Sequence, residues 1–134
     1  ILGEHGDSSF PVLSSASIGG QLLSTHPLFS GEKAFEAYEK ARRAAYEIIN
    51  AKGATYYAIG VVVRELVRTI VRDTRSILPV SVPLQNYYGI SDVSLSVPCI
   101  VGRNGVEQML TIALNEEEQL QLHASAEMIT QYLA

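Results

Sequence analysis

The segment of this sequence that could most readily do chemistry lies near its start, where residues 3–8 read GEHGDS. An imidazole can give and take a proton near neutral pH, so His5 is a candidate general acid and base. Gly3 and Gly6 allow the backbone to turn and a substrate to come close. The alternative is an ordinary histidine in a surface loop. Side chains two positions apart usually point in different directions, so we expect a carboxylate other than Asp7 to orient His5.

A second candidate is the segment Gly53-Ala54-Thr55-Tyr56-Tyr57, which separates two predicted helices. A helix N-terminus that carries a hydroxyl group suits an anion or the polar edge of a substrate. The alternative is that Thr55 only caps the second helix. The two roles are compatible.

Other chemistries have little support. Neither His26 nor His123 lies in a residue pattern typical of a catalytic or metal site, and we expect both to face solvent. No H-x-x-x-H pattern or cysteine cluster predicts a metal site, and neither a G-x-G-x-x-G turn nor a P-loop is present. The single cysteine, Cys99, lies in an apolar alternating run and is interpreted as a small buried hydrophobe. A chain without disulfides fits a reducing compartment.

The composition is that of an ordinary globular domain. The 134 residues are 47% hydrophobic and 18% charged, with a net charge of −4, and we expect residues 1–134 to form one domain. The acidic balance argues against general binding to nucleic acid or to anionic membranes, and no apolar run reaches the length of a membrane span. A solvated or subunit-contact face is favoured over an anion site for four clustered arginines, namely Arg64, Arg68, Arg72 and Arg75.

Two long helices are predicted in the first half of the chain. Apolar residues recur every three or four positions over residues 32–51, and Tyr38 lies on this stripe. Apolar side chains wrap most of the circumference over residues 55–73, so we expect that second helix to be largely buried, with its arginines at the exposed end.

Strands and a final helix follow. Residues 77–84, 93–101 and 106–114 predict strands, and Gly102-Arg103-Asn104-Gly105 predicts a hairpin turn. Pro79, Pro83 and Pro98 favour sheet edges or strand ends. Asn115 and Glu118 have the spacing of a capping box, followed by a buried stripe of Leu122, Ala126, Ile129 and Leu133. The predicted fold is α+β, with long helices packed on a twisted antiparallel sheet.

Three segments together are similar to one family. Residues 1–12 (ILGEHGDSSFPV) resemble the active-site loop of L-lactate dehydrogenases. Residues 45–59 (AYEIINAKGATYYAI) and 93–106 (VSLSVPCIVGRNGV) resemble the family's next hallmark and its late hairpin. The resemblance covers the whole chain and matches the C-terminal, substrate-side domain of bacterial members. It implies that the N-terminal Rossmann domain is absent from this chain, which we therefore expect to be a fragment.

The resemblance also implies roles for single residues. His5 matches the histidine that donates a proton to pyruvate during hydride transfer from NADH and removes it from L-lactate in reverse. Thr55 matches a substrate-pocket residue, and Ile59 matches an apolar residue that packs against the nicotinamide. Tyr46 matches a tyrosine proposed as a modification site, although a core-facing position is the other interpretation. No metal is implied.

Further expectations follow from the family. They are a cytoplasmic enzyme of pyruvate fermentation, a homotetramer, and contact with the chain's own Rossmann domain. The family's substrate-binding arginine, its histidine-orienting aspartate and its mobile loop all precede the matched region, so we expect this chain alone to be inactive. Two alternatives stay open: malate dehydrogenase of the same superfamily, and a non-catalytic oligomerisation domain.

Overall fold

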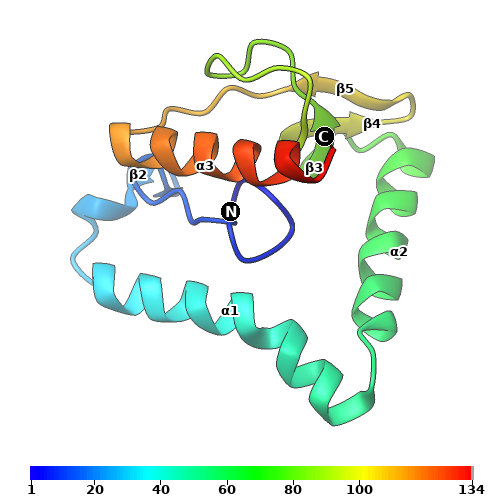
Figure 1. Ribbon diagram of the computed structural model, residues 1–134, viewed down its shortest axis with the longest axis horizontal. Coiled ribbons are helices and arrows are strands. Elements are labelled where there is room, and N and C mark those ends of the chain that lie inside the picture. The colour runs from blue at the N-terminus through cyan, green and yellow to red at the C-terminus, as the bar shows by residue number, and fades with distance from the viewer. Residues whose placement is uncertain (134) are drawn as a thin grey trace.

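Three long helices and two small antiparallel sheets form the part of the chain that the computed structural model describes, residues 1–133 (Figure 1). The helices are α1 (Gly31–Lys52), α2 (Tyr56–Arg72) and α3 (Glu116–Leu133), with one 3₁₀ turn, η1 (Leu23–Thr25). The strands are β1 (Ser17–Ile18), β2 (Gln21–Leu22), β3 (Ser76–Pro83), β4 (Ser94–Gly102) and β5 (Gly105–Met109). The predicted α+β class is confirmed.

The helix ends follow from local side-chain and backbone chemistry. Ser30 caps α1 by accepting a hydrogen bond from the Lys33 N–H (3.4 Å). Gly53 ends α1 at a φ of +80°, which glycine adopts without strain. The predicted capping box of α3 is confirmed: Asn115 Oδ1 accepts from the Glu118 N–H (2.8 Å), and the Glu118 carboxylate accepts from the Asn115 N–H (3.0 Å).

The larger sheet has the antiparallel order β3-β4-β5. The predicted turn is confirmed, since Gly102 pairs with Gly105. Strand β5 ends at Met109, earlier than predicted. Pro98 lies within the central strand and not at an edge, which corrects the sequence interpretation. It is tolerated because it pairs with Pro79 of β3, which also has no N–H, and because the β4–β5 pairing begins one residue later, at Cys99.

The hydrophobic core is formed by side chains from one face of β4, from the segment between β3 and β4, from the N-terminal segment and from α3. Its β4 members alternate along the strand, and Cys99 among them is fully buried as predicted. Burial raises the pKa of the Cys99 thiol. On α3, Leu122 and Ala126 are buried and Ile129 is half-buried, whereas the predicted position of Leu133 lies outside the described side chains.

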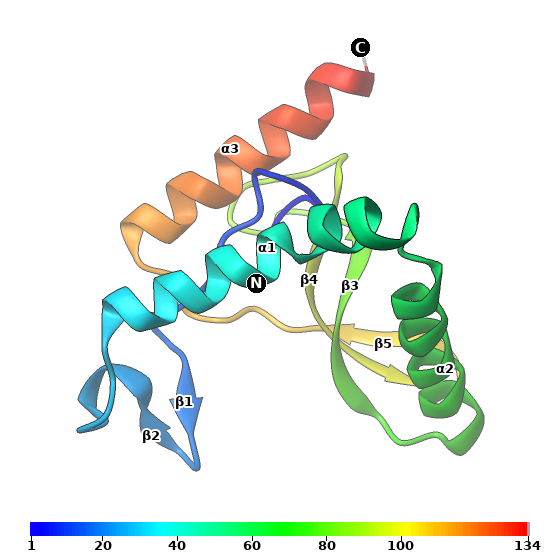
Figure 2. The ribbon, with the colours of Figure 1, turned by 90° about the horizontal axis from the view of Figure 1, so that it is seen from below.

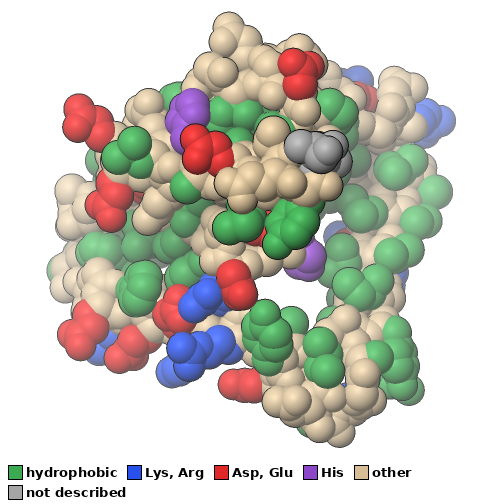
Figure 3. All heavy atoms as spheres, viewed as in Figure 1, with side chains coloured by type: hydrophobic (Ala, Val, Ile, Leu, Met, Phe, Trp, Pro, Cys, Tyr) green, Lys and Arg blue, Asp and Glu red, His purple; other side chains and the backbone are tan. Residues whose placement is uncertain are grey.

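Helix α2 is not largely buried, and this corrects the prediction. Only Thr69 is buried, and apolar side chains lie open along the helix. In Figures 1 and 2 α2 projects away from α1 and α3 and meets the rest of the molecule at the β3–β5 sheet, where it packs mainly against β4. Figure 3 shows hydrophobic side chains gathered over α2. The sequence pattern predicted a covered helix, but within residues 1–133 nothing covers this one. The exposed large hydrophobic side chains of α2 are Tyr56, Tyr57, Ile59, Val61, Val62, Val63, Val67 and Val71.

Helix α1 is also more open than its apolar stripe indicated. Tyr38 is its buried residue. Tyr46 is 57% exposed, so the interpretation of Tyr46 as a core-facing side chain is wrong. Helix α1 packs on the N-terminal segment near Tyr38, and the second half of α1 extends past that segment (Figure 1). Among residues 1–133, no helix combines the length and hydrophobicity that crossing a membrane requires.

Candidate active site

The loop that carries His5 begins and ends on a short antiparallel pairing. Leu2 pairs with Phe10, and Gly3 exchanges main-chain hydrogen bonds with Ser96 of β4 (3.2 and 3.0 Å). Gly3 has a φ of +94°, and a Cβ atom added there would lie 2.6 Å from Ser125 Oγ. Glycine is therefore required at position 3, both for the backbone conformation and for the close approach of α3.

Helix α3 holds this loop through Ser125, whose side chain is fully buried. The Glu4 N–H donates to Ser125 Oγ (2.7 Å), and Ser125 Oγ lies 3.1 Å from Ser8 Oγ. The Ser8 hydroxyl in turn donates to the Glu4 carboxylate. These contacts join residues on both sides of His5 to one hydroxyl of α3.

Helix α1 holds the other side of the loop. The Tyr38 hydroxyl donates to the Ser9 carbonyl. Arg42 forms an ion pair with Asp7 (3.3 Å) and a two-point pair with Glu39 (3.1 and 2.9 Å). The hydrogen bond from Arg42 lowers the pKa of Glu39, and the same bond raises the pKa of Arg42. Arg42 therefore stays charged, and it attracts Asp7 from the surface of α1.

His5 itself is exposed. Within the described residues its imidazole makes no hydrogen bond and no ion pair. Asp7 faces Arg42, which agrees with the expectation that Asp7 does not orient His5. The loop backbone is thus fixed from three directions, while its histidine side chain is left open to solvent or to a ligand.

Thr55 and Ile59 lie at the start of α2. Thr55 is half-buried at the N-cap position, but its hydroxyl makes no capping hydrogen bond. Its carbonyl accepts from the Ile59 N–H (3.1 Å), and Ile59 is 50% exposed. Beside them, the Lys52 ammonium lies 5.7 Å from the centre of the Tyr57 ring. The α1–α2 corner is therefore partly open and carries one free hydroxyl and one apolar surface.

No hydrogen bond joins Thr55 to the His5 loop in the described part of the chain. An opening lies between the N-terminal loop, α1 and α2, and the space-filling view shows that side chains do not close it (Figure 3). The chain thus holds the two predicted site segments on opposite sides of an unfilled space, without direct contact between them.

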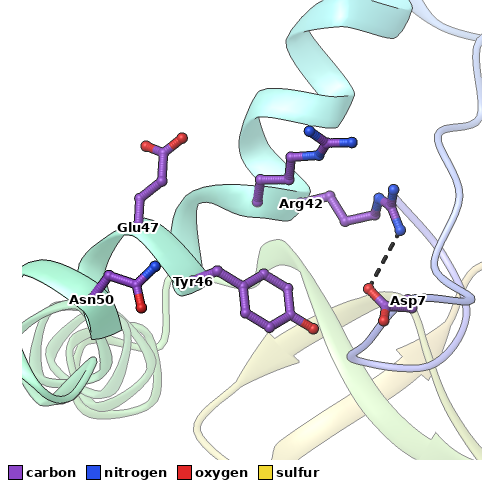
Figure 4. A pocket seen from close by; sticks show the side chains of 6 residues that line it. Asp7, Arg42, Tyr46, Glu47 and Asn50 are labelled. Atoms are coloured by element: carbon purple, nitrogen blue, oxygen red, sulfur yellow. Dashed lines mark hydrogen bonds and ion pairs between the residues drawn. The ribbon is translucent and has the colours of Figure 1, made fainter.

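An open hollow of about 400 Å³, lined mainly by charged residues, adjoins the His5 loop. Arg42 and Tyr46 extend from α1 toward the loop that carries Asp7 (Figure 4). The remaining lining residues are Arg43, Glu47 and Asn50. Tyr46 therefore faces this hollow beside the predicted site and not the core.

The other histidines lie apart from the loop. His26 is half-buried, so the prediction that it faces solvent is only partly right, and its Nδ1 accepts a hydrogen bond from the Leu28 N–H (3.2 Å). His123 is exposed as predicted, with Nε2 2.9 Å from the Tyr88 carbonyl oxygen. Among residues 1–133, no group of three histidine, cysteine or carboxylate side chains could hold a metal ion.

Ser125, Tyr38 and Arg42 were missed as site residues by sequence reasoning. Ser125 had one usable signal: it is a polar residue beside Ala126, on the stripe of α3 that was predicted to be buried. A buried hydroxyl needs a hydrogen-bond partner, but the sequence does not say that the partner lies 121 positions away.

Comparisons with known proteins agree on one family. The model of the lactate/malate dehydrogenase alpha/beta C-terminal domain matches residues 1–134. The L-lactate dehydrogenase of Salinibacter ruber is 47% identical over 130 residues, which cover 94% of this chain and 41% of that protein.

Solved structures show the same likeness. A minor L-lactate dehydrogenase from Enterococcus mundtii aligns with a TM-score of 0.90 at 34% identity, over 99% of this chain and 44% of that one. The malate dehydrogenase from Aeropyrum pernix aligns with a TM-score of 0.86 at 30% identity, over 97% and 43%. This chain therefore spans less than half the length of the proteins that it matches.

Proposed function

The chain belongs to the lactate/malate dehydrogenase C-terminal domain family, and on that premise we propose that it is the substrate side of an NAD-dependent L-lactate dehydrogenase. The observation that carries the proposal is the His5 loop. Its backbone is held by β4, α1 and α3, while the imidazole is exposed. A fixed loop with a free imidazole suits proton transfer to and from a bound substrate.

In this proposal His5 donates a proton to the carbonyl oxygen of pyruvate and removes it from the hydroxyl of L-lactate. The Thr55 hydroxyl lines the substrate pocket, and it is free to do so because it makes no capping hydrogen bond. The two segments face one opening (Figure 3), which a substrate would bridge.

NAD is the proposed cofactor. The residue of this chain proposed to meet it is Ile59, whose half-exposed apolar side chain fits one face of a flat nicotinamide ring. When bound, the nicotinamide supplies or accepts the hydride at the substrate carbon. A nucleotide-binding domain that precedes this chain would hold the rest of the cofactor, as the relatives' greater length supports.

We prefer lactate over malate as the substrate because curated relatives that are 37–47% identical to this chain carry the name L-lactate dehydrogenase. The fold does not decide the question, since a malate dehydrogenase aligns almost as well. An assay of the full-length enzyme with pyruvate and oxaloacetate decides it, and a strong preference for oxaloacetate would overturn the choice.

The proposed partners are the enzyme's own nucleotide-binding domain and further copies in a homotetramer. The open apolar side chains of α2 support such contacts, because large exposed apolar patches mark association surfaces. Tyr46 is exposed enough for modification, and that role and a cytoplasmic location stay predictions from the resemblance.

The central test is His5→Gln in the full-length enzyme, with His123→Gln as the matched control on an exposed histidine outside the loop. We expect His5→Gln to lower kcat by about 10²- to 10⁴-fold, the usual contribution of a general acid and base, with an unchanged circular dichroism spectrum. The control should keep its turnover. Retained activity in a folded His5→Gln enzyme would remove His5 from the mechanism and favour a non-catalytic assembly domain.

A further inference from the structure

The hydrogen bonds around Ser125 form a closed ring. The Glu4 N–H donates to Ser125 Oγ, and the Ser8 hydroxyl donates to the Glu4 carboxylate. The Ser8–Ser125 contact of 3.1 Å admits either hydroxyl as donor. Because Ser8 has one proton and gives it to Glu4, Ser125 must be the donor to Ser8. Every donor in the ring then has one acceptor.

This ring encloses the short segment that carries His5. Glu4 directly precedes His5, and Ser8 lies three positions after it. The Glu4 side chain folds back over Gly6, where an added Cβ would collide with the carboxylate. The path of the backbone through His5 is therefore set on both sides by contacts that meet at Ser125.

Ser125 is well placed to hold this geometry with precision. Its side chain is fully buried on α3, so water cannot replace its partners at little cost. Its neighbours Leu122 and Ala126 pack in the core, which fixes the helix under the loop. Gly3 leaves room for the close approach, since a Cβ there would overlap Ser125 Oγ.

From this arrangement we infer that Ser125 is a positioning residue for His5, acting through the Glu4 N–H and the Ser8 hydroxyl. The inference rests on the proposed proton-transfer role of His5. Ser125 does not touch the imidazole. It sets where the imidazole stands when substrate is bound, so its loss should slow proton transfer more than it weakens binding.

The test is Ser125→Ala in the full-length enzyme, followed by steady-state kinetics with pyruvate and NADH. Small misplacements of a reacting group can cost on the order of 100-fold in rate. We expect kcat to fall roughly 10- to 100-fold while KM for pyruvate changes by less than about threefold. A folded Ser125→Ala enzyme with normal kcat would overturn the inference.

Two further variants separate positioning from general loosening of α3. Ser8→Ala breaks the ring at its second point and keeps the Glu4–Ser125 bond, so we expect a smaller fall in kcat and a non-additive double variant. Glu118→Gln removes a buried carboxylate from the same helix without touching the His5 loop. Glu118→Gln should lower the melting temperature but leave kcat unchanged. If Glu118→Gln lowered kcat as much as Ser125→Ala does, the role of Ser125 would be structural only.

The His5→Gln enzyme distinguishes failure of this inference from failure of the proposed function. If His5→Gln abolishes turnover and Ser125→Ala does not slow it, only the positioning role falls. If His5→Gln keeps its turnover, the proton-transfer role falls, and with it the basis of the inference. If Ser125→Ala does not fold, Ser8→Ala is the deciding variant. An unchanged kcat in Ser8→Ala would show that the hydrogen-bond ring does not position His5.

Discussion

Thr55 stands at the N-cap of α2, yet its hydroxyl makes no capping hydrogen bond. Removal of this hydroxyl should therefore not affect folding, so Thr55 is a suitable residue for testing the substrate pocket. We expect Thr55→Val in the full-length enzyme to leave the melting temperature nearly unchanged and to raise KM for pyruvate roughly tenfold, about the effect of losing one hydrogen bond to substrate.

Thr55→Ser is the matched control, since it keeps the hydroxyl and loses only a methyl group. It should stay close to the parent enzyme in KM. A Thr55→Val enzyme with an unchanged KM would show that the side chain does not meet the substrate, and a large loss of stability would show that it supports α2 instead.

Single residues also mark the limit of what the sequence could predict. Residue types alone made the loop around His5 a candidate for proton transfer, and the family resemblance of three segments made that prediction specific. The residues that support the loop were not predicted, because Tyr38, Arg42 and Ser125 come from distant helices. Residue type reports what a side chain can do, whereas its partner depends on tertiary packing.

At the scale of elements, the N-terminus of α3 offers a prediction about pH. Burial acts to raise the pKa of Glu118, but hydrogen bonds from the Ser14 hydroxyl and from the main-chain N–H groups of Asn115, Ser14 and Leu13 outweigh it and lower that pKa below 4.5. A lowered folded-state pKa means that the charged form stabilises the fold. This stabilisation is fully present above the ordinary glutamate pKa and is lost as pH falls through the lowered value.

We therefore expect Glu118→Gln to lower the free energy of unfolding by roughly 1–3 kcal/mol at pH 7, with the difference from the parent shrinking as the pH drops below about 4.5. Thermal or urea denaturation at several pH values measures this. Glu117→Gln is the matched control, because it removes the same charge from an exposed site on the same turn. If the loss of unfolding free energy in Glu118→Gln did not change with pH, the lowered pKa of Glu118 would not be the source of the stabilisation.

The elements themselves were predicted well where local chemistry decides them. The bounds of α1 and α2 and the hairpin at residues 102–105 follow from caps, glycines and periodicity. The burial of α2 was predicted wrongly. Apolar periodicity indicates that a surface will be covered, but it does not say whether the cover comes from the same domain.

At the scale of the whole molecule, this chain holds the proposed proton-transfer loop but spans less than half of its relatives' length. We expect the purified 134-residue chain to show no lactate-dependent formation of NADH, because most of the proposed cofactor contacts and the proposed substrate-carboxylate contact are assigned to a domain outside residues 1–134. Absorbance at 340 nm measures this, with the full-length enzyme as the positive control. Turnover by the chain alone would show that residues 1–134 contain a complete site.

The Ser125 ring also has a consequence for the order of synthesis. A ribosome makes Glu4 long before Ser125, since 121 positions separate them. Until α3 emerges, water and not Ser125 is the hydrogen-bond partner of the Glu4 N–H, and the Ser8 hydroxyl lacks its contact with Ser125. Such non-local contacts form late, since chain-closure entropy opposes them until other contacts exist. The geometry around the residue proposed to move protons would thus be completed by a helix that is translated well after His5, so a polypeptide truncated before α3 would carry His5 without the geometry to use it.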